Sequence, residues 1–180
     1  MQINMKKVLY FAALLLCVGL TSCEKEEIGG TATESMAGKW YVTVDAVDES
    51  GNLPDADYAD FFGIGRVHMI TNNTAANVPT ELMVDDLGSF WSFRVKTVAD
   101  PAGMTFATNT TDNNNLNGDP INVTITGGKI LPGAGRQNNG SVADSIVFYV
   151  SFSDDTYPAK YGYAKYKVSG IRYSGLEEND

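Results

Sequence analysis

The stretch GKWYVTVD at residues 38–45 alternates apolar and polar side chains, and it sets the pattern for the rest of the chain. Trp40, Val42 and Val44 lie on one side of this alternation, and the residues between them lie on the other. Successive side chains of a β-strand point to opposite faces of a sheet. A period of two therefore predicts a strand with one buried face.

The same alternation recurs after residue 45, between links that are rich in turn-forming residues. Further strands are expected at about residues 64–71, 82–84, 91–95, 104–108, 121–125, 146–152 and 161–173. No convincing helix follows the N-terminal apolar run. The longer strands favour a closed antiparallel up-and-down barrel over a sandwich, and closure leaves no exposed edge. The predicted fold is all-β, a barrel of roughly eight strands.

Two links are longer than the others. Residues 109–119 are almost wholly polar, and residues 127–140 are rich in glycine. We expect both to be loops. Ile130 and Leu131, in the second of them, would be available to fold over an opening of the barrel.

The N-terminal residues predict an export signal that ends at a lipidated cysteine. Lys6 and Lys7 precede an apolar run at residues 8–20, and LTSC at residues 20–23 has the form of a lipobox. Cys23 would carry the lipid and become the first mature residue. The alternatives are an ordinary signal peptide that ends near a cysteine, or a short anchor helix, although the run is too short to span a bilayer comfortably.

This interpretation divides the chain into a signal peptide (1–22), a flexible tether (23–35) and a barrel domain (36–180). Lys25-Glu26-Glu27 resembles the acidic signal that directs some commensal lipoproteins to the outer face of the outer membrane. A solvated charge run with no targeting role is the alternative. Without Lys6 and Lys7 the chain keeps 11 basic against 22 acidic residues. Such a charge argues against nucleic acid as a partner.

Catalytic and metal-binding patterns are missing from the sequence. His68 is the only histidine, no Gly-x-Ser-x-Gly elbow occurs, and His68 falls on the polar side of its expected strand. The acidic pairs Asp85-Asp86 and Asp154-Asp155 lie at expected turns. Asp is common in turns because its side chain hydrogen-bonds the backbone there, which explains these pairs without catalysis. Residues 113–118 echo a calcium loop but lack its first and last acidic ligands. We expect no cofactor and no metal.

The start of the first strand resembles a known fold family. Gly38-Lys39-Trp40 resembles the Gly-x-Trp signature of lipocalin-like (calycin) barrels, in which the tryptophan closes one end of the barrel. An Arg or Lys near the last strand packs across that ring in the family. Arg172 is in step with the apolar residues Tyr166 and Val168, so the resemblance implies that Trp40 and Arg172 close the barrel.

A closer resemblance covers nearly all of the domain. The order of segments from residues 38–42 through 73–77 and 85–91 to 163–164 is similar to a family of small commensal-bacterial lipoproteins described as lipid-binding putative hydrolase. The resemblance implies a calycin-like barrel and a hydrophobic ligand. The hydrolase part would need catalytic residues that the chain does not display, so a binding protein without enzymatic activity is the favoured interpretation.

The inward-facing residues decide whether such a barrel holds a ligand. The candidates for lining a ligand are Trp91, Phe93, Phe106, Phe148, Val150 and Tyr166. An eight-stranded barrel can either fill its interior with side chains or hold one small molecule, and the sequence leaves both open. The expected ligand is a lipid, a fatty acid or another hydrophobic molecule.

Two other functions stay open. The first is a hydrolase that acts on a lipid or ester, which would need His68 buried beside a serine. The second is a surface accessory protein that binds a glycan or a protein. Its exposed aromatic platform would be built from Tyr157, Tyr161, Tyr163 and Tyr173.

Overall fold

The computed structural model describes residues 30–176 of the chain. The predicted signal peptide, the lipidated Cys23 and most of the predicted tether lie outside these residues. Within residues 30–176, no helix has the length and apolar character needed to cross a membrane.

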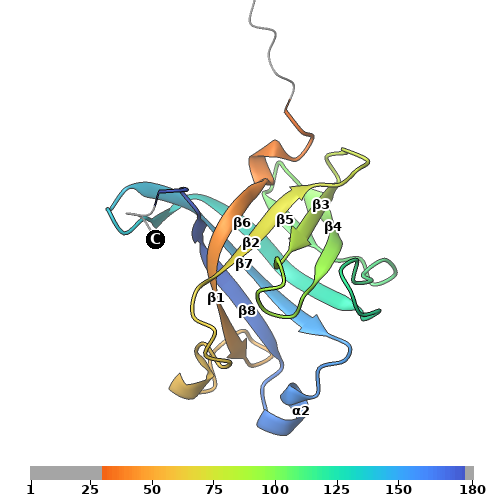
Figure 1. The fold of residues 1–180 in the computed structure, drawn as a ribbon, viewed down its shortest axis with the longest axis vertical. Coiled ribbons are helices and arrows are strands. Elements are labelled where there is room, and N and C mark those ends of the chain that lie inside the picture. Colours follow the sequence, from red (N-terminus) through yellow and green to blue (C-terminus); the bar gives the residue numbers. More distant parts are fainter. Residues whose placement is uncertain (1–29, 177–180) are drawn as a thin grey trace, which may run out of the picture. The chain divides into compact units, whose positions relative to one another are not determined.

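Eight antiparallel strands form a closed barrel, in which each strand pairs with the next and the last pairs with the first (Figure 1). The strands are β1 (Gly38–Val47), β2 (Val67–Asn73), β3 (Glu81–Asp85), β4 (Arg94–Asp100), β5 (Thr105–Ala107), β6 (Val123–Arg136), β7 (Val142–Phe152) and β8 (Lys165–Arg172). The register of β1 with β8 runs from Trp40 opposite Arg172 to Val47 opposite Lys165. The predicted all-β up-and-down barrel is confirmed.

The barrel interior is filled by the apolar side chains that alternate along the strands. In β1, Trp40, Val42, Val44 and Ala46 are buried, whereas the residues between them are half-buried. The core also includes Val84, Phe93, Val95, Phe106, Ile125, Ile130, Phe148, Val150, Tyr166 and Val168, each at most 3% exposed. Side chains this inaccessible leave no room for a water molecule among them. Burying each one contributes about 1.5–3 kcal/mol.

The prediction of a loop at residues 127–140 is wrong, because β6 continues through most of this segment. The register of β6 with β7 shifts between Thr126 and Lys129, so that the strand bulges and then resumes pairing. Gly127 adopts φ +61°, a left-handed conformation that suits glycine and allows the bulge. Ile130 is consequently 1% exposed and packs in the core rather than over an opening.

The fourth strand begins later than predicted, at Arg94, and Trp91 lies in the preceding loop. The backbone N–H groups of residues 90–93 donate to the carboxylate of Asp86 instead of to a neighbouring strand. The Asp86 side chain therefore takes the place of a neighbouring strand as the hydrogen-bond acceptor at this point. The prediction of no helix after the signal is also wrong in detail, because α2 (Tyr157–Tyr161) forms a short helix between β7 and β8.

The up-and-down connectivity separates the loops into two sets. Four loops, at residues 48–66, 86–93, 108–122 and 153–164, lie at the end of the barrel that we call the cap end. The turns at residues 74–80, 101–104 and 137–141 lie at the other end, which we call the closed end. The chain enters the barrel at the closed end through the short helix η1 (Glu34–Met36), away from α2 at the cap end (Figure 1).

Candidate functional site

A single tryptophan occupies the closed end. Trp40 is fully buried, and its indole Nε1 donates a hydrogen bond to Oγ1 of Thr71 at 2.8 Å. That hydroxyl donates in turn to the carbonyl oxygen of Met36 at 2.6 Å. The guanidinium carbon of Arg172 lies 4.4 Å from the centre of the Trp40 ring. The two residues singled out in the sequence are therefore in direct contact.

Arg172 is held by two further partners. Its Nε lies 3.0 Å from Oδ2 of Asp144, and its Nη1 donates to the carbonyl oxygen of Ala37 at 2.6 Å. A Cβ at Gly38 would overlap Nη1 of Arg172. The glycine of the Gly-x-Trp signature thus leaves the space in which the guanidinium sits. Every polar group named at this end has a partner, so the arrangement serves packing.

The cap end is covered by a different structure, which we call the aromatic cap. It consists of rings from three loops: Phe61, Phe62, Phe90, Trp91, Tyr157 and Tyr161. Phe62 is at its centre, with ring centroids 5.7 Å from Phe90, 5.5 Å from Tyr157 and 5.6 Å from the buried Tyr166. The cap rings are half-buried or exposed, and they cover the fully buried rings of the core.

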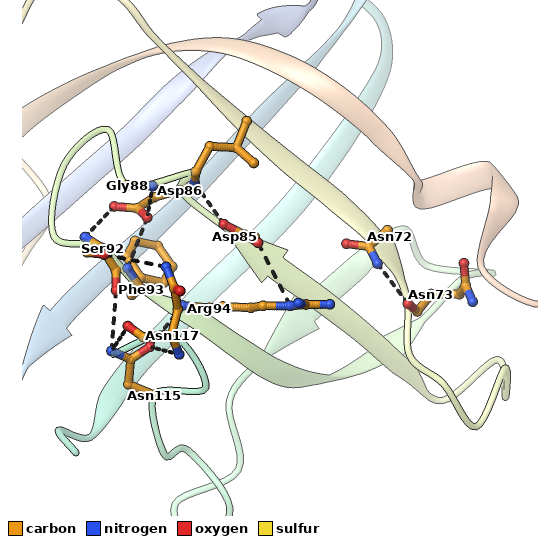
Figure 2. Close-up of polar contacts among 11 residues, drawn as sticks. Asn72, Asn73, Asp85, Asp86, Gly88, Ser92, Phe93, Arg94, Asn115 and Asn117 are labelled. Atoms are coloured by element: carbon orange, nitrogen blue, oxygen red, sulfur yellow. Dashed lines mark hydrogen bonds and ion pairs between the residues drawn. The ribbon is translucent and has the colours of Figure 1, made fainter. Parts of the chain in front are cut away.

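Asp86 positions two rings of the cap. Its side chain is completely buried, and its two oxygens accept hydrogen bonds from the backbone N–H groups of Gly88, Phe90, Trp91, Ser92 and Phe93 at 2.7–3.1 Å. Figure 2 shows the carboxylate among Gly88, Ser92 and Phe93. The turn predicted at Asp85-Asp86 is present, but its role is larger than expected. It holds the backbone that carries Phe90 and Trp91.

A chain of polar groups lies beneath the cap. Tyr166 donates its hydroxyl proton to Oδ2 of Asp155 at 2.5 Å, and the hydroxyl of Tyr163 lies 2.6 Å from that of Tyr166. Burial raises the pKa of Tyr163 to about 12. Burial, followed by the hydrogen bond to Asp155, raises the pKa of Tyr166 well above its usual value. Both phenols therefore stay neutral and act as hydrogen-bond donors throughout the physiological range.

A cavity of about 340 Å³ opens beside Trp91. Phe90, Trp91 and Ile121 form its apolar wall, and Asn117, Asp119 and Asp154 are among its polar lining. The Trp91 ring stacks on Phe152 at 4.7 Å with an interplanar angle of 4°, and its Nε1 donates to Oδ1 of Asp154 at 3.1 Å. The cavity thus joins an aromatic surface to a carboxylate at the edge of the cap.

A protein-family model described as lipid-binding putative hydrolase matches residues 25–177. The chain belongs to this family. The match spans the whole barrel, so the family resemblance stated from the sequence is confirmed. Among curated proteins, no match to the chain was found.

The candidate ligand-lining residues lie in two different places in this member of the lipid-binding family. Phe93, Phe106, Phe148, Val150 and Tyr166 are at most 3% exposed and pack together inside the barrel. Trp91 is half-buried in the cap. Sequence reasoning missed Phe61, Phe62 and Phe90. Phe61-Phe62 gave a usable signal, because an apolar pair between Asp60 and Gly63 in a non-periodic segment has no strand to explain it.

A hydrolase of the Ser–His type, which the sequence left open, needs a histidine that can act as a base. His68 stacks on Tyr41, with ring centroids 5.0 Å apart, and meets Tyr173 edge to face at 4.7 Å. Its Nδ1 is buried and has no hydrogen-bond partner. A catalytic histidine of the Ser-His-Asp type is oriented by a hydrogen bond to this nitrogen. His68 lacks that orientation.

The other predicted clusters are also placed by the structure. Tyr157 and Tyr161 are each 39% exposed and stack on one another, whereas Tyr163 is only 5% exposed. The four tyrosines considered as an exposed platform therefore do not share one surface. Asn115, in the segment that echoes a calcium loop, is engaged by its neighbours: its Oδ1 accepts from the backbone N–H groups of Arg94 and Asn117 (Figure 2).

Proposed function

We propose that this protein is a lipid-anchored component of the cell envelope whose barrel binds a lipid or another amphiphile through its cap end. Membership of a lipid-binding family and the barrel fold both support a lipid or hydrophobic ligand. The observation that carries the location is the aromatic cap. It is made of half-buried and exposed rings on loops, directly above the apolar interior.

An acyl chain binds at this end by displacing cap rings and lying over the core, because the core itself is filled by buried side chains. Phe62 and Phe90 are the rings to move, since they lie 5.6 and 5.1 Å from Tyr166 and belong to loops. Each aromatic pair that separates costs about 0.5–1.5 kcal/mol. Each methylene of the ligand that becomes buried contributes about 0.8 kcal/mol. A medium-length acyl chain therefore offsets the opening of the cap.

The loops that carry these rings contain backbone conformations that store some strain. Asp60, Leu87 and Ser92 have φ values of 44°, 54° and 54°, which are unusual for residues other than glycine. Such residues cost of order 1–3 kcal/mol each and often occur at ligand clamps. They adjoin Phe61-Phe62 and Phe90-Trp91, so relief of this strain would assist the movement of the cap.

Ligand binding is tested by the fluorescence of Trp91, against a constant background from the buried Trp40. We expect saturable binding of decanol. Phe62→Ala and Phe90→Ala should weaken it, because the displaced rings close over the bound alkyl chain and each variant removes that contact. His68→Ala serves as the control, because His68 contacts Tyr41 and Tyr173 rather than the cap rings, and it should leave binding unchanged. A linear, non-saturating response in the unmutated protein would show that the barrel is a packed structural unit.

The lipid anchor is a separate part of the proposal and has its own test. Cys23 is the last residue of the lipobox and the sole cysteine after the expected signal. Three acyl chains on this residue would hold the protein on the membrane, since one chain alone binds only marginally. Cys23→Ala should move the protein out of the carbonate-washed membrane fraction. Retention of that variant on the washed membrane would contradict the anchor and the envelope location together.

A further inference from the structure

The cavity beside Trp91 has a chemical character that the proposed lipid-binding function does not by itself require. One wall is aromatic, formed by Phe90 and Trp91, whose rings meet edge to face at 5.5 Å. The opposite lining is polar and includes Asn117, Asp119 and Asp154. An amphiphile that enters under the cap would place its polar head here, where the aromatic cap ends.

All of the formal charge on the lining of this cavity is negative. Asp119 and Asp154 are its only charged residues. Both carboxylates belong to exposed residues, so their charge is available to a ligand. The Trp91 indole fixes one of them, because its Nε1 donates to Oδ1 of Asp154. One face of the Trp91 ring is covered by Phe152, so a positive head group would meet a carboxylate together with the remaining surface of the aromatic wall.

Two basic residues, one adjacent in sequence to the cavity and one on the cap helix, are directed elsewhere. Arg94 adjoins the cavity in sequence, but its Nε lies 3.8 Å from Oδ2 of Asp85, and its side chain extends away from Asn115 and Asn117 (Figure 2). Lys160, on the cap helix, lies over the ring of Tyr161 at 4.8 Å. Neither cation is in place to receive an anionic head group.

The geometry points to a cationic head group: this cavity selects amphiphiles that carry an ammonium group over those that carry a carboxylate. The inference rests on the proposed binding at the cap end and names the ligand class for it. The aromatic wall recognises the ammonium by cation–π attraction, and Asp119 and Asp154 add charge complementarity. A fatty-acid anion would instead meet two carboxylates with no basic partner on the lining.

Three probes with the same alkyl chain separate this inference from the proposed function. Decyltrimethylammonium, decanol and decanoate are titrated into the full chain by calorimetry at low ionic strength, below their micelle concentrations. We expect the ammonium compound to bind at least about tenfold more tightly than decanoate, with decanol between them. Added salt should weaken the binding of the ammonium compound and leave that of decanol unchanged.

Charge-removing variants locate the effect. Asp119→Asn and Asp154→Asn should each weaken the binding of the ammonium compound by about threefold and leave the binding of decanol unchanged. Glu34→Gln is the matched control, because Glu34 is exposed in η1 at the closed end and its loss changes the net charge equally. An equal loss in the control would mean that the net charge alone attracts the cation, and would overturn the inference.

Failure of the two proposals would look different. If decanol and decanoate bind and the ammonium compound binds no better than decanoate, cationic selection is wrong and lipid binding at the cap stands. If none of the three probes binds, lipid binding at the cap is wrong and the selection falls with it. Tighter binding of the ammonium compound, lost specifically in Asp119→Asn and Asp154→Asn, supports both.

Discussion

The two ends of this barrel both use aromatic rings but hold them in different ways. At the closed end, Trp40 is fully buried between strands and meets Arg172 on its ring and Thr71 at its indole nitrogen. At the cap end, six rings come from loops and helix α2, and they remain half-buried or exposed. The closed end belongs to the core, whereas the cap is a layer placed over it.

The comparison shows that an aromatic ring's place, on a strand or in a loop, decides how easily the ring can move. A ring on a strand moves only if the sheet deforms. A ring on a loop moves with local rearrangement, which costs far less than global unfolding. We therefore expect substitutions at the closed end to change stability and substitutions in the cap to change binding, and the following predictions can break or sharpen that division.

The largest expected effect is at the closed end. Trp40→Ala should lower the free energy of unfolding by about 3–5 kcal/mol, because it removes a fully buried ring and leaves Thr71 and Arg172 without it. Denaturant unfolding followed by circular dichroism measures this loss. A change within about 0.5 kcal/mol, which is usual for surface positions, would contradict the closing role of Trp40.

The next effect tests whether the cap is organised by one carboxylate. Asp86→Asn replaces one acceptor oxygen with an amide that repels the backbone donors around it, so we expect a loss of about 1.5–3 kcal/mol. Trp91 fluorescence should shift as its backbone support is lost. Asp85→Asn is the control: Asp85 accepts a hydrogen bond from one backbone N–H, that of Leu87, and pairs loosely with the half-exposed Arg94, so the substitution should cost less than about 1 kcal/mol. Equal losses in the two variants would contradict the special role of Asp86.

The parts of this fold that could be predicted from sequence are those in which one face contrasts with the other. β1, β7 and β8 alternate cleanly, and parity placed Arg172 on the same side as Tyr166 and Val168. The first residues of β6 were predicted as a strand, but its continuation after Thr126 was not, because the bulge there breaks the period of two. The later start of β4 escaped because a buried side chain, Asp86, takes the place of a strand as the hydrogen-bond acceptor.

The cap could be predicted only in part. Trp91 was placed among the candidate residues because it is apolar and in step with Phe93, although it lies in a loop and not on the strand. Phe62 and Phe90 come from loops far apart in sequence, and no periodicity shows that they meet at 5.7 Å. Such contacts follow from barrel closure, which brings alternate loops to one end. The acidic lining of the cavity arises in the same way, from Asp119 and Asp154.

A smaller effect on stability should appear at alkaline pH, and it should involve the cap end and not the closed end. Tyr163 has its folded pKa raised to about 12 by burial, above the value near 10 of an unfolded chain. The fold therefore favours the neutral phenol, and this stabilisation is complete below about pH 10 and lost as the pH rises through about 12. Tyr163→Phe should cost about 1 kcal/mol near neutral pH and should make the alkaline loss of stability shallower.

Thermal melts at a series of pH values, with the ultraviolet absorbance of ionised tyrosine as a second signal, measure this effect. The closed end offers the internal comparison, because the contacts of Trp40 with Thr71 and Arg172 involve no phenol. The Trp40 environment should therefore persist when the phenols beneath the cap begin to ionise. Ionisation of every tyrosine near pH 10 in the folded protein would contradict the burial of Tyr163 and Tyr166.

The smallest expected effect on stability is at the outer layer of the cap. Tyr157 is 39% exposed and its ring contacts Phe62 and Tyr161, so Tyr157→Ala should change the free energy of unfolding by no more than about 0.5 kcal/mol. Leu116→Ala is the matched control, because Leu116 is 59% exposed on another loop of the cap end and is not part of the cap. Both variants should unfold like the unmutated protein, but Tyr157→Ala alone should weaken decanol binding, by a few-fold, because Phe62 loses a neighbour that supports it over the ligand. If Tyr157→Ala instead destabilises the barrel as Trp40→Ala does, the cap is part of the core, and the two ends of the barrel do not differ in the way we propose.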